Sequence, residues 1–161
     1  MKRKIAAVCL ILALAVSCLS ACGSGESSTA SKDIDIASVS EQIRKECEFR
    51  DELLELSMDV LSNQYKVGDL KDSIEQMSVY VSASGMKVDE IAIFKMKSAD
   101  DAAKMKDVFE KRKSSLVKKF EDYVPDEVGQ IEKSDMAVSG QYAMFVISPD
   151  HQKAVEIFNK G

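Results

Sequence analysis

The N-terminal segment most constrains what this chain can fold into, because it does not belong to the folded domain. Lys2, Arg3 and Lys4 form a positive cluster, and a 12-residue apolar run follows at Ile5–Val16. A membrane-spanning helix needs about 20 apolar residues, so this run is too short to span a bilayer. The pattern is typical of an export signal that is cleaved from the chain, and we therefore exclude residues 1–21 from the fold.

The end of this segment, Leu19-Ser20-Ala21-Cys22, resembles the lipobox of bacterial lipoproteins. The resemblance implies that the chain is cut before Cys22 and that the Cys22 sulfur carries a diacylglyceryl group, with fatty acids such as palmitate. Two acyl chains hold a protein stably on a bilayer, whereas one chain binds only marginally. We therefore expect attachment to the cell membrane through lipid on Cys22, on the extracytoplasmic face. An ordinary secretory signal cut elsewhere is the alternative.

The charge balance excludes one class of partner. The sequence has 22 Lys and Arg against 27 Asp and Glu, and without the three N-terminal bases it carries 19 bases against 27 acids, a formal charge of −8. General nucleic-acid binding needs a basic surface, so we expect no nucleic-acid partner.

The remaining chain divides into a tether and a domain. Residues 22–36 begin with the lipidated cysteine and continue as GSGESSTASK, which has no large apolar residue and predicts a flexible linker. Residues 37–161 are long enough for a single modest core. Cys47 is the one cysteine left in this domain, so no intramolecular disulfide can form.

Hydrophobic periodicity predicts an α+β domain. Apolar spacings of three and four indicate one long helix at about 40–61 and a second that starts at Ser98, and a short C-terminal helix starts at Ser148 and Pro149. Strands are predicted at 78–83, 90–96, 130–138 and 141–148. The strand at 90–96 is apolar on both faces, which indicates an interior strand covered twice. The expected fold is a four-stranded, mainly antiparallel sheet packed by two long helices and a short C-terminal helix.

Few residues offer chemistry. His151 is the single histidine, no carboxylate run has calcium-loop spacing, and no nucleophile has a plausible base, so we expect no metal, no cofactor and no enzymatic activity. A thiol on an apolar helical stripe, as at Cys47, is far more often a buried small hydrophobe than a nucleophile.

Two arginines interrupt apolar stripes. Arg112 lies within the stripe of the second long helix, and Arg50 lies near the middle of the first. A buried guanidinium needs an acceptor, because an unpaired charge costs several kcal/mol. Glu90 shares a strand face with Ala92 and Phe94, and the hypothesis is a partly buried Glu90–Arg112 ion pair that joins sheet to helix. An anion-binding pocket built on Arg112 is the functional alternative.

Residues 104–119 contain seven bases and two acids. A solvated helix face, paired in part with the acidic first helix, explains this excess. A patch for anionic wall polymers or for a partner is the other interpretation.

Four short motifs in order are similar to a domain of unknown function that is common in small lipoproteins of Gram-positive bacteria. These motifs are Asp89–Lys95 (DEIAIFK), Arg112, Tyr123-Val124-Pro125 and Gly140-Gln141-Tyr142. The resemblance covers about residues 60–160 and implies a lipid-anchored extracytoplasmic domain with no assigned activity. It transfers no catalytic residue.

The function expected from these observations is a non-enzymatic binding module that meets an unknown protein or cell-wall partner. The alternative is an accessory solute-binding lipoprotein with a small pocket near Arg112 and Tyr123, which would have to be concave and lined by apolar residues. A small hydrolase is a third class, but it needs a nucleophile and a base within hydrogen-bond reach, for which the sequence offers no pair.

Overall fold

One antiparallel sheet organises the chain, and its strand order is β1-β2-β3-β5-β4. The computed structural model describes residues 33–161, so the expected signal peptide, the expected lipid site at Cys22 and most of the expected tether lie outside it. The strands are β1 (Leu53–Glu55), β2 (Ile74–Ser82), β3 (Glu90–Met96), β4 (Asp135–Ser139) and β5 (Tyr142–Ile147). The helices are α1 (Ile36–Glu46), α2 (Met58–Tyr65), α3 (Ala99–Phe120), α4 (Val128–Glu132) and α5 (His151–Lys160), with short 3-10 turns at Gly68–Ser73 and Pro125–Glu127.

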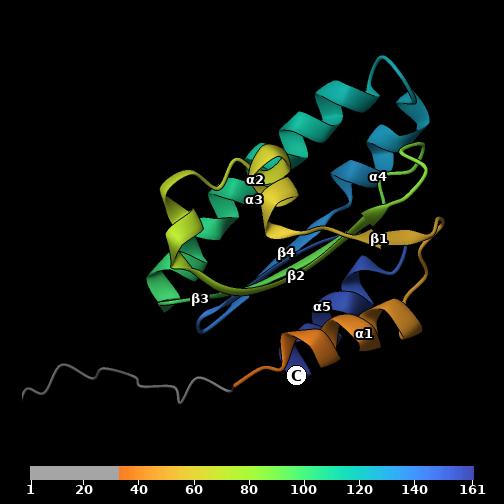
Figure 1. Cartoon of the computed structure of the whole chain (residues 1–161). Coiled ribbons are helices and arrows are strands. Elements are labelled where there is room, and N and C mark those ends of the chain that lie inside the picture. Colours follow the sequence, from red (N-terminus) through yellow and green to blue (C-terminus); the bar gives the residue numbers. More distant parts are fainter. Residues whose placement is uncertain (1–32) are drawn as a thin grey trace, which may run out of the picture.

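Helices cover both faces of the sheet (Figure 1). Helices α2, α3 and α4 pack on one face, and α1 and α5 pack on the other. Strand β3 therefore buries Ala92 and Phe94 towards α3, while Ile91 and Ile93 point towards α1 and α5. The two-sided apolar pattern of residues 90–96 predicted this arrangement, and the α+β class is confirmed.

The core under α3 is aromatic. Phe109 stacks on Phe145 with ring centroids 5.6 Å apart, and Tyr65 meets Phe94 edge-on at 5.7 Å. Such pairs contribute about 0.5–1.5 kcal/mol beyond their buried area. The cluster holds α2 and α3 against the centre of the sheet.

Helix α3 begins as the sequence predicts. The Ser98 side chain accepts a hydrogen bond of 3.1 Å from the Asp101 amide, which satisfies one of the free N–H groups of the first turn. Two lysines, Lys118 and Lys119, occupy the last turn, where the helix dipole favours positive charge.

The long helix expected at 40–61 is wrong. Helix α1 ends at Glu46, and α2 begins only at Met58. Between them, β1 pairs with the edge of β2, with Leu54 opposite Val81, and the Leu56 amide donates to the Val79 carbonyl. Pairing with the sheet satisfies the backbone of this segment, and tertiary contacts override its helical spacing. The sheet consequently has five strands rather than four, and α3 is the one long helix of the described chain.

Three further boundaries differ from the sequence-based expectation. Residues 130–132 belong to α4 rather than to a strand, and β4 starts at Asp135. Helix α5 starts at His151 rather than at Pro149; the Ser148 hydroxyl accepts from the Asp150 amide at 2.9 Å and donates to the Glu48 carbonyl at 2.6 Å. At the other end, Ile34 and Ile36 are already buried against the sheet, so the packed part of the chain begins before residue 37. Within residues 33–161, no helix is both long and apolar enough to cross a membrane.

Candidate functional site

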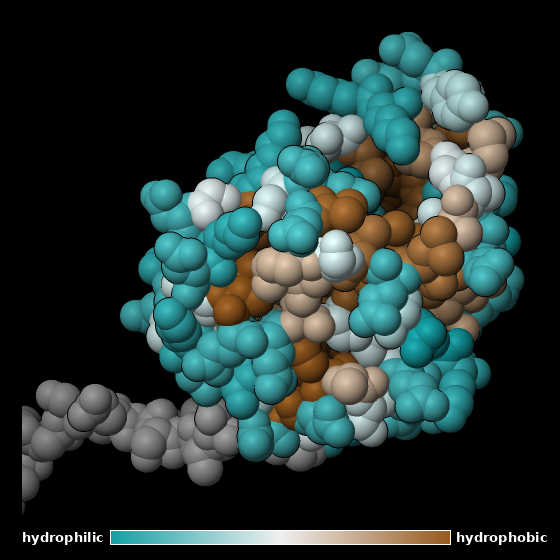
Figure 2. Space-filling view, viewed as in Figure 1, coloured by the Kyte–Doolittle hydropathy of each residue, from teal (hydrophilic) through white to brown (hydrophobic). Residues whose placement is uncertain are grey.

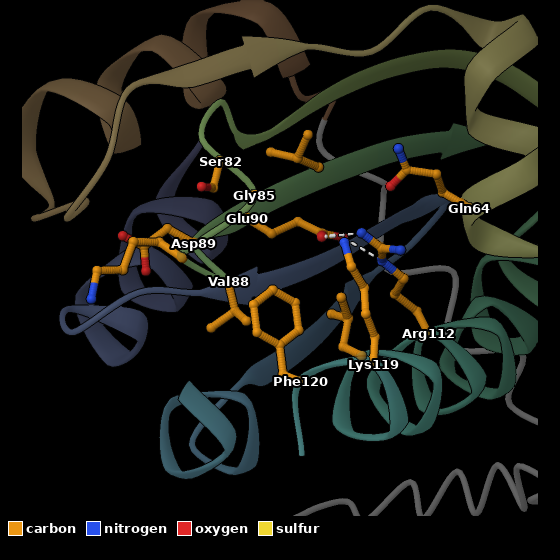
Figure 3. Close-up of a pocket in the computed structure, with 12 residues that line it drawn as sticks. Gln64, Ser82, Gly85, Val88, Asp89, Glu90, Arg112, Lys119 and Phe120 are labelled. Atoms are coloured by element: carbon orange, nitrogen blue, oxygen red, sulfur yellow. Dashed lines mark hydrogen bonds and ion pairs between the residues drawn. The ribbon is translucent and has the colours of Figure 1, made fainter. Parts of the chain in front are cut away.

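A cleft of about 100 Å³ opens between α2, the C-terminal half of α3 and the loop that joins β2 to β3 (Figure 3). Its walls are apolar, formed by Val81, Val88, Leu116 and Phe120. Its polar lining residues are Gln64, Ser82, Lys87, Asp89, Glu90, Arg112 and Lys119, and Gly85 completes the lining. The cleft thus combines an apolar interior with charged groups, and we take it as the candidate site.

Glu90 and Arg112 face one another in this cleft (Figure 3). Arg112 Nε donates to Glu90 Oε1 at 3.1 Å, and Arg112 Nη2 donates to Glu90 Oε2 at 2.6 Å. The Glu90 side chain is 2% exposed and that of Arg112 is 11% exposed. Two parallel bonds between a guanidinium and a carboxylate are the strongest geometry for such a pair. The structure therefore brings the two residues together as a buried link between β3 and α3.

Tyr65 completes this cluster from α2. Its hydroxyl donates to Glu90 Oε1, and the Arg112 guanidinium lies 5.2 Å from the centre of its ring. Burial, together with the negative charge of Glu90, raises the pKa of Tyr65 well above its usual value. Burial acts to lower the pKa of Arg112, but the Glu90 carboxylate outweighs it and the Arg112 pKa is raised. The tyrosine stays neutral and the arginine stays charged.

A second buried network lies beside the first and is centred on Arg50. Its guanidinium binds Asp89 Oδ1 through Nε at 3.0 Å and Nη2 at 2.5 Å, and it binds Glu127 through Nη1 at 3.1 Å and Nη2 at 2.8 Å. Glu127 also accepts from Lys87 Nζ at 3.0 Å and from the Val88 amide at 3.2 Å. The network joins the α1–β1 segment, the β2–β3 loop and the turn before α4.

The charged groups of this second network shift one another's pKa values. Burial acts to raise the pKa of Glu127, yet hydrogen bonds from Lys87 and Arg50 lower it overall. Burial acts to lower the pKa of Arg50, and the hydrogen bonds to Asp89 and Glu127 raise it overall. The carboxylate and the guanidinium are thus both held in their charged forms, and the loops that form one side of the cleft are clamped.

The cleft is therefore not a bare anion pocket, since the Arg112 charge is neutralised by Glu90 and the Arg50 charge by Asp89 and Glu127. Lys119 is the lining cation without an ion pair among the described residues. In residues 33–161, no three His, Cys, Asp or Glu side chains come together as a metal site. What the arrangement offers chemically is a small cavity with apolar and charged lining residues, in which Lys87 and Arg112 are paired with carboxylates and Lys119 is not.

The other residues singled out by the sequence lie elsewhere. Tyr123 is 68% exposed and does not line the cleft, so the structure does not bring it together with Arg112. His151 Nδ1 lies 2.6 Å from Asp135 Oδ2, far from the cleft lining. Cys47 is buried in the core beneath α1, and burial raises its pKa, which disfavours the reactive thiolate. Arg50 follows α1 in a loop rather than occupying a helix.

Sequence reasoning missed Asp89 and Glu127 as partners of Arg50. Both are acids outside the regular part of a strand or long helix, where charged residues are usually solvated. Their side chains are nevertheless 0% and 3% exposed. Asp89 directly precedes β3, whose apolar residues lie on both faces, and this is the one sequence signal that pointed to burial.

Four exposed apolar residues lie close to cleft-lining residues, in sequence or across the sheet. In the described chain, the large apolar side chains that are exposed are Leu54, Val60, Met86 and Tyr123, which we call the apolar rim. Each neighbours a lining residue: Leu54 pairs with Val81, Val60 is one helical turn from Gln64, Met86 lies between Gly85 and Lys87, and Tyr123 follows Phe120 by three positions. Figure 2 shows hydrophobic residues gathered over β1 and α2, with a hollow between β1 and the helices above it.

Comparison with known proteins places this domain in a family. No curated protein and no solved structure matches the chain. A family described as "Domain of unknown function (DUF4358)" matches residues 46–148. The match begins earlier than the expected residue 60, so it includes Arg50 and β1 as well as Glu90, Arg112 and Glu127, and it excludes most of α1 and all of α5. It covers more than half of the chain, which therefore belongs to the DUF4358 family.

Proposed function

We propose that the protein is a bacterial lipoprotein, held on the extracytoplasmic face of the cell membrane by lipid on Cys22, and that it is a non-enzymatic binding module. Its partner is another protein, which it meets through the cleft and the apolar rim. The support for the anchor is the N-terminal charge, the short apolar run and the Leu19–Cys22 motif, together with the polar tether that follows.

The observation that carries the binding role is the position of the apolar rim. Exposed apolar groups scattered singly need no explanation, but a group of them around one cavity marks an interaction surface. Here each exposed large apolar residue of the described chain lies within four residues of a cleft-lining residue or pairs with one across the sheet. Tyrosine is enriched among residues that dominate binding energy, and Tyr123 is the most exposed of the four.

The size of the cleft favours a protein partner over a free solute. Small-molecule sites enclose roughly 300–1,000 Å³. The cleft has about 100 Å³, and its arginine is already neutralised by Glu90. It accommodates one side chain of a partner better than a whole metabolite. The alternative function, a solute-binding lipoprotein with a pocket near Arg112 and Tyr123, therefore ranks second.

Crosslinking in living cells tests this proposal. The lipidated protein is crosslinked, and captured proteins are identified by mass spectrometry, with Cys22→Ala as the unanchored control. A reproducible partner that disappears in the control supports an anchored binding module. Capture of no protein above background would contradict the protein-binding role and favour the solute-binding alternative. A thermal-shift screen against metabolites would then test for that solute.

A further inference from the structure

A group of lysines on the other side of α3 from the cleft has no role in the proposed function. Residues 104–119 carry seven bases and two acids in a chain whose net charge is −5. Some of these bases are used within the fold: Arg112 binds Glu90, Lys104 binds Asp101 at 2.8 Å, and Lys113 donates to the Glu132 carbonyl. Lys111 and Lys118 have no such use, since no carboxylate of residues 33–161 lies within ion-pair distance of either.

These two lysines converge with a third from α2. Lys66, Lys111 and Lys118 line one hollow of about 370 Å³, together with the hydroxyl residues Ser114 and Ser115. Glu110 also lines it and is the one acid there. A second hollow, of about 520 Å³, shares Lys66 and Lys111, but Asp69, Asp101 and Asp107 also line it, so the excess of positive charge belongs to the first hollow.

The backbone places Lys66 at this position. It ends α2 in the left-handed conformation, with φ 48° and ψ 47°, and no other non-glycine residue of the described chain has a positive φ. The next residue, Val67, is buried in the core between α3 and the sheet, and its packing there fixes the position of the turn. Lys66 is thus held across from Lys111 rather than carried on a free loop.

Three unpaired cations around one hollow repel one another, which is unfavourable unless an anion neutralises them. The group has a net charge of +2 once Glu110 is counted, and the Ser115 hydroxyl is available to donate a further hydrogen bond. Lysines with nearby hydroxyl donors suit phosphate, whose oxygens accept several charge-assisted bonds at once. A single carboxylate would engage fewer of these donors.

We infer that Lys66, Lys111 and Lys118 form a binding site for a phosphate-bearing anion, separate from the cleft and beyond its proposed role. Along α3, Lys111 and Lys118 are seven residues apart, which corresponds to about 10.5 Å. A ligand with phosphates in series reaches two of these lysines, so it binds more tightly than one phosphate. In Figure 1 the site belongs to the α2–α3 layer, on the opposite side of the sheet from α1.

The first test is an NMR titration of the full ¹⁵N-labelled chain in a nonionic detergent. Pyrophosphate is expected to shift the amide signals of Lys66, Lys111, Ser115 and Lys118 saturably, with a dissociation constant below about 1 mM. Inorganic phosphate is expected to bind more weakly at the same residues, and added salt is expected to weaken both. Shifts that do not saturate by about 50 mM would overturn the inference.

Matched variants distinguish a specific anion-binding site from nonspecific electrostatic attraction to the lysines of α3. The double variant Lys111→Gln/Lys118→Gln removes two charges from the hollow, and Lys106→Gln/Lys133→Gln removes two charges from exposed lysines outside both hollows. We expect at least a tenfold loss of pyrophosphate affinity in the first variant and less than a twofold change in the second. Equal losses in the two variants would show nonspecific attraction and would refute the site.

Two further probes identify the source of the phosphate. Soluble poly(glycerol phosphate) and vesicles that contain phosphatidylglycerol both present phosphodiesters, one in solution and one on a membrane. Tighter binding to the polymer assigns a soluble polyanion, and tighter binding to the vesicles assigns a lipid headgroup. Failure of all four probes overturns the inference and leaves the proposed protein-binding role of the cleft untouched.

Discussion

Replacing Arg112 with leucine tests the buried link between sheet and helix. Arg112→Leu removes both hydrogen bonds to Glu90, whose side chain is 2% exposed, and leaves a carboxylate buried without its cation. Breaking a buried pair in this way costs about 3–5 kcal/mol of unfolding free energy. Domains of this size have a total stability of about 5–15 kcal/mol, so the loss corresponds to a melting temperature lower by about 10–20 °C.

The assay is urea unfolding followed by far-UV circular dichroism, with Glu90→Gln/Arg112→Leu as the informative second variant. This double variant leaves no buried charge at this link, and the amide oxygen of the introduced glutamine can still accept from Tyr65, so most of the lost stability is expected to return. Lys106→Leu is the control on the exposed face of α3, expected within about 0.5 kcal/mol of the parent. A single variant as stable as the parent, or a double variant no better than the single, would refute the reasoning.

Three other results are expected. Arg50→Met leaves Asp89 and Glu127 without their shared cation, which lowers the free energy of unfolding by about 3–5 kcal/mol. Amide hydrogen exchange is expected to become faster at residues 47–52 and 84–89. Unchanged exchange would contradict the role of Arg50 in holding these loops. Because the fold lowers the pKa of Glu127, the ionised Glu127 stabilises the folded state above about pH 4.5, and this stabilisation declines as the pH falls further. Because the fold raises the pKa of Tyr65, the stability of the folded state also declines as the pH rises above about 10. A pH series of melting temperatures without either decline would contradict these assignments. Deleting residues 33–45 removes the side chains of Ile34, Ile36, Val39 and Ile43, whose burial contributes about 1.5–3 kcal/mol each. The remaining chain retains the matched family region, yet we expect it to lose cooperative unfolding in calorimetry. Cooperative melting of that fragment would show that α1 is dispensable.

The sequence predicted the elements whose periodicity agrees with their tertiary contacts. The strand at 90–96 and the helix from Ser98 fall within this class, since each buries the apolar positions that its own period aligns. The helix expected at 40–61 failed for the opposite reason. Its apolar spacing fits α1 and α2 separately. Residues 53–55 between them pair with the edge of β2, and no local sequence pattern predicts that pairing.

The same distinction applies to the candidate site. Glu90 and Arg112 stand out in the sequence because each is a charge within an apolar stripe, and burial of one requires the other. Asp89 and Glu127 lie in loops, where a charge needs no explanation, and only the fold shows that Arg50 joins them. Tyr123 was named from the sequence as a pocket residue, but its exposure and that of Leu54 could not be predicted, because exposure depends on what packs around a side chain.

The most direct test of the account is a position-resolved photo-crosslink in living cells. A photoreactive amino acid is placed at Tyr123 on the apolar rim, and at Gln152 on the exposed side of α5 as the control. We expect the probe at Tyr123 to capture one reproducible protein and the probe at Gln152 to capture none. Adding Leu54→Asp to the Tyr123 probe is expected to abolish the capture. Equal capture at both positions, or capture that survives the charge at Leu54, would contradict a binding role for this face.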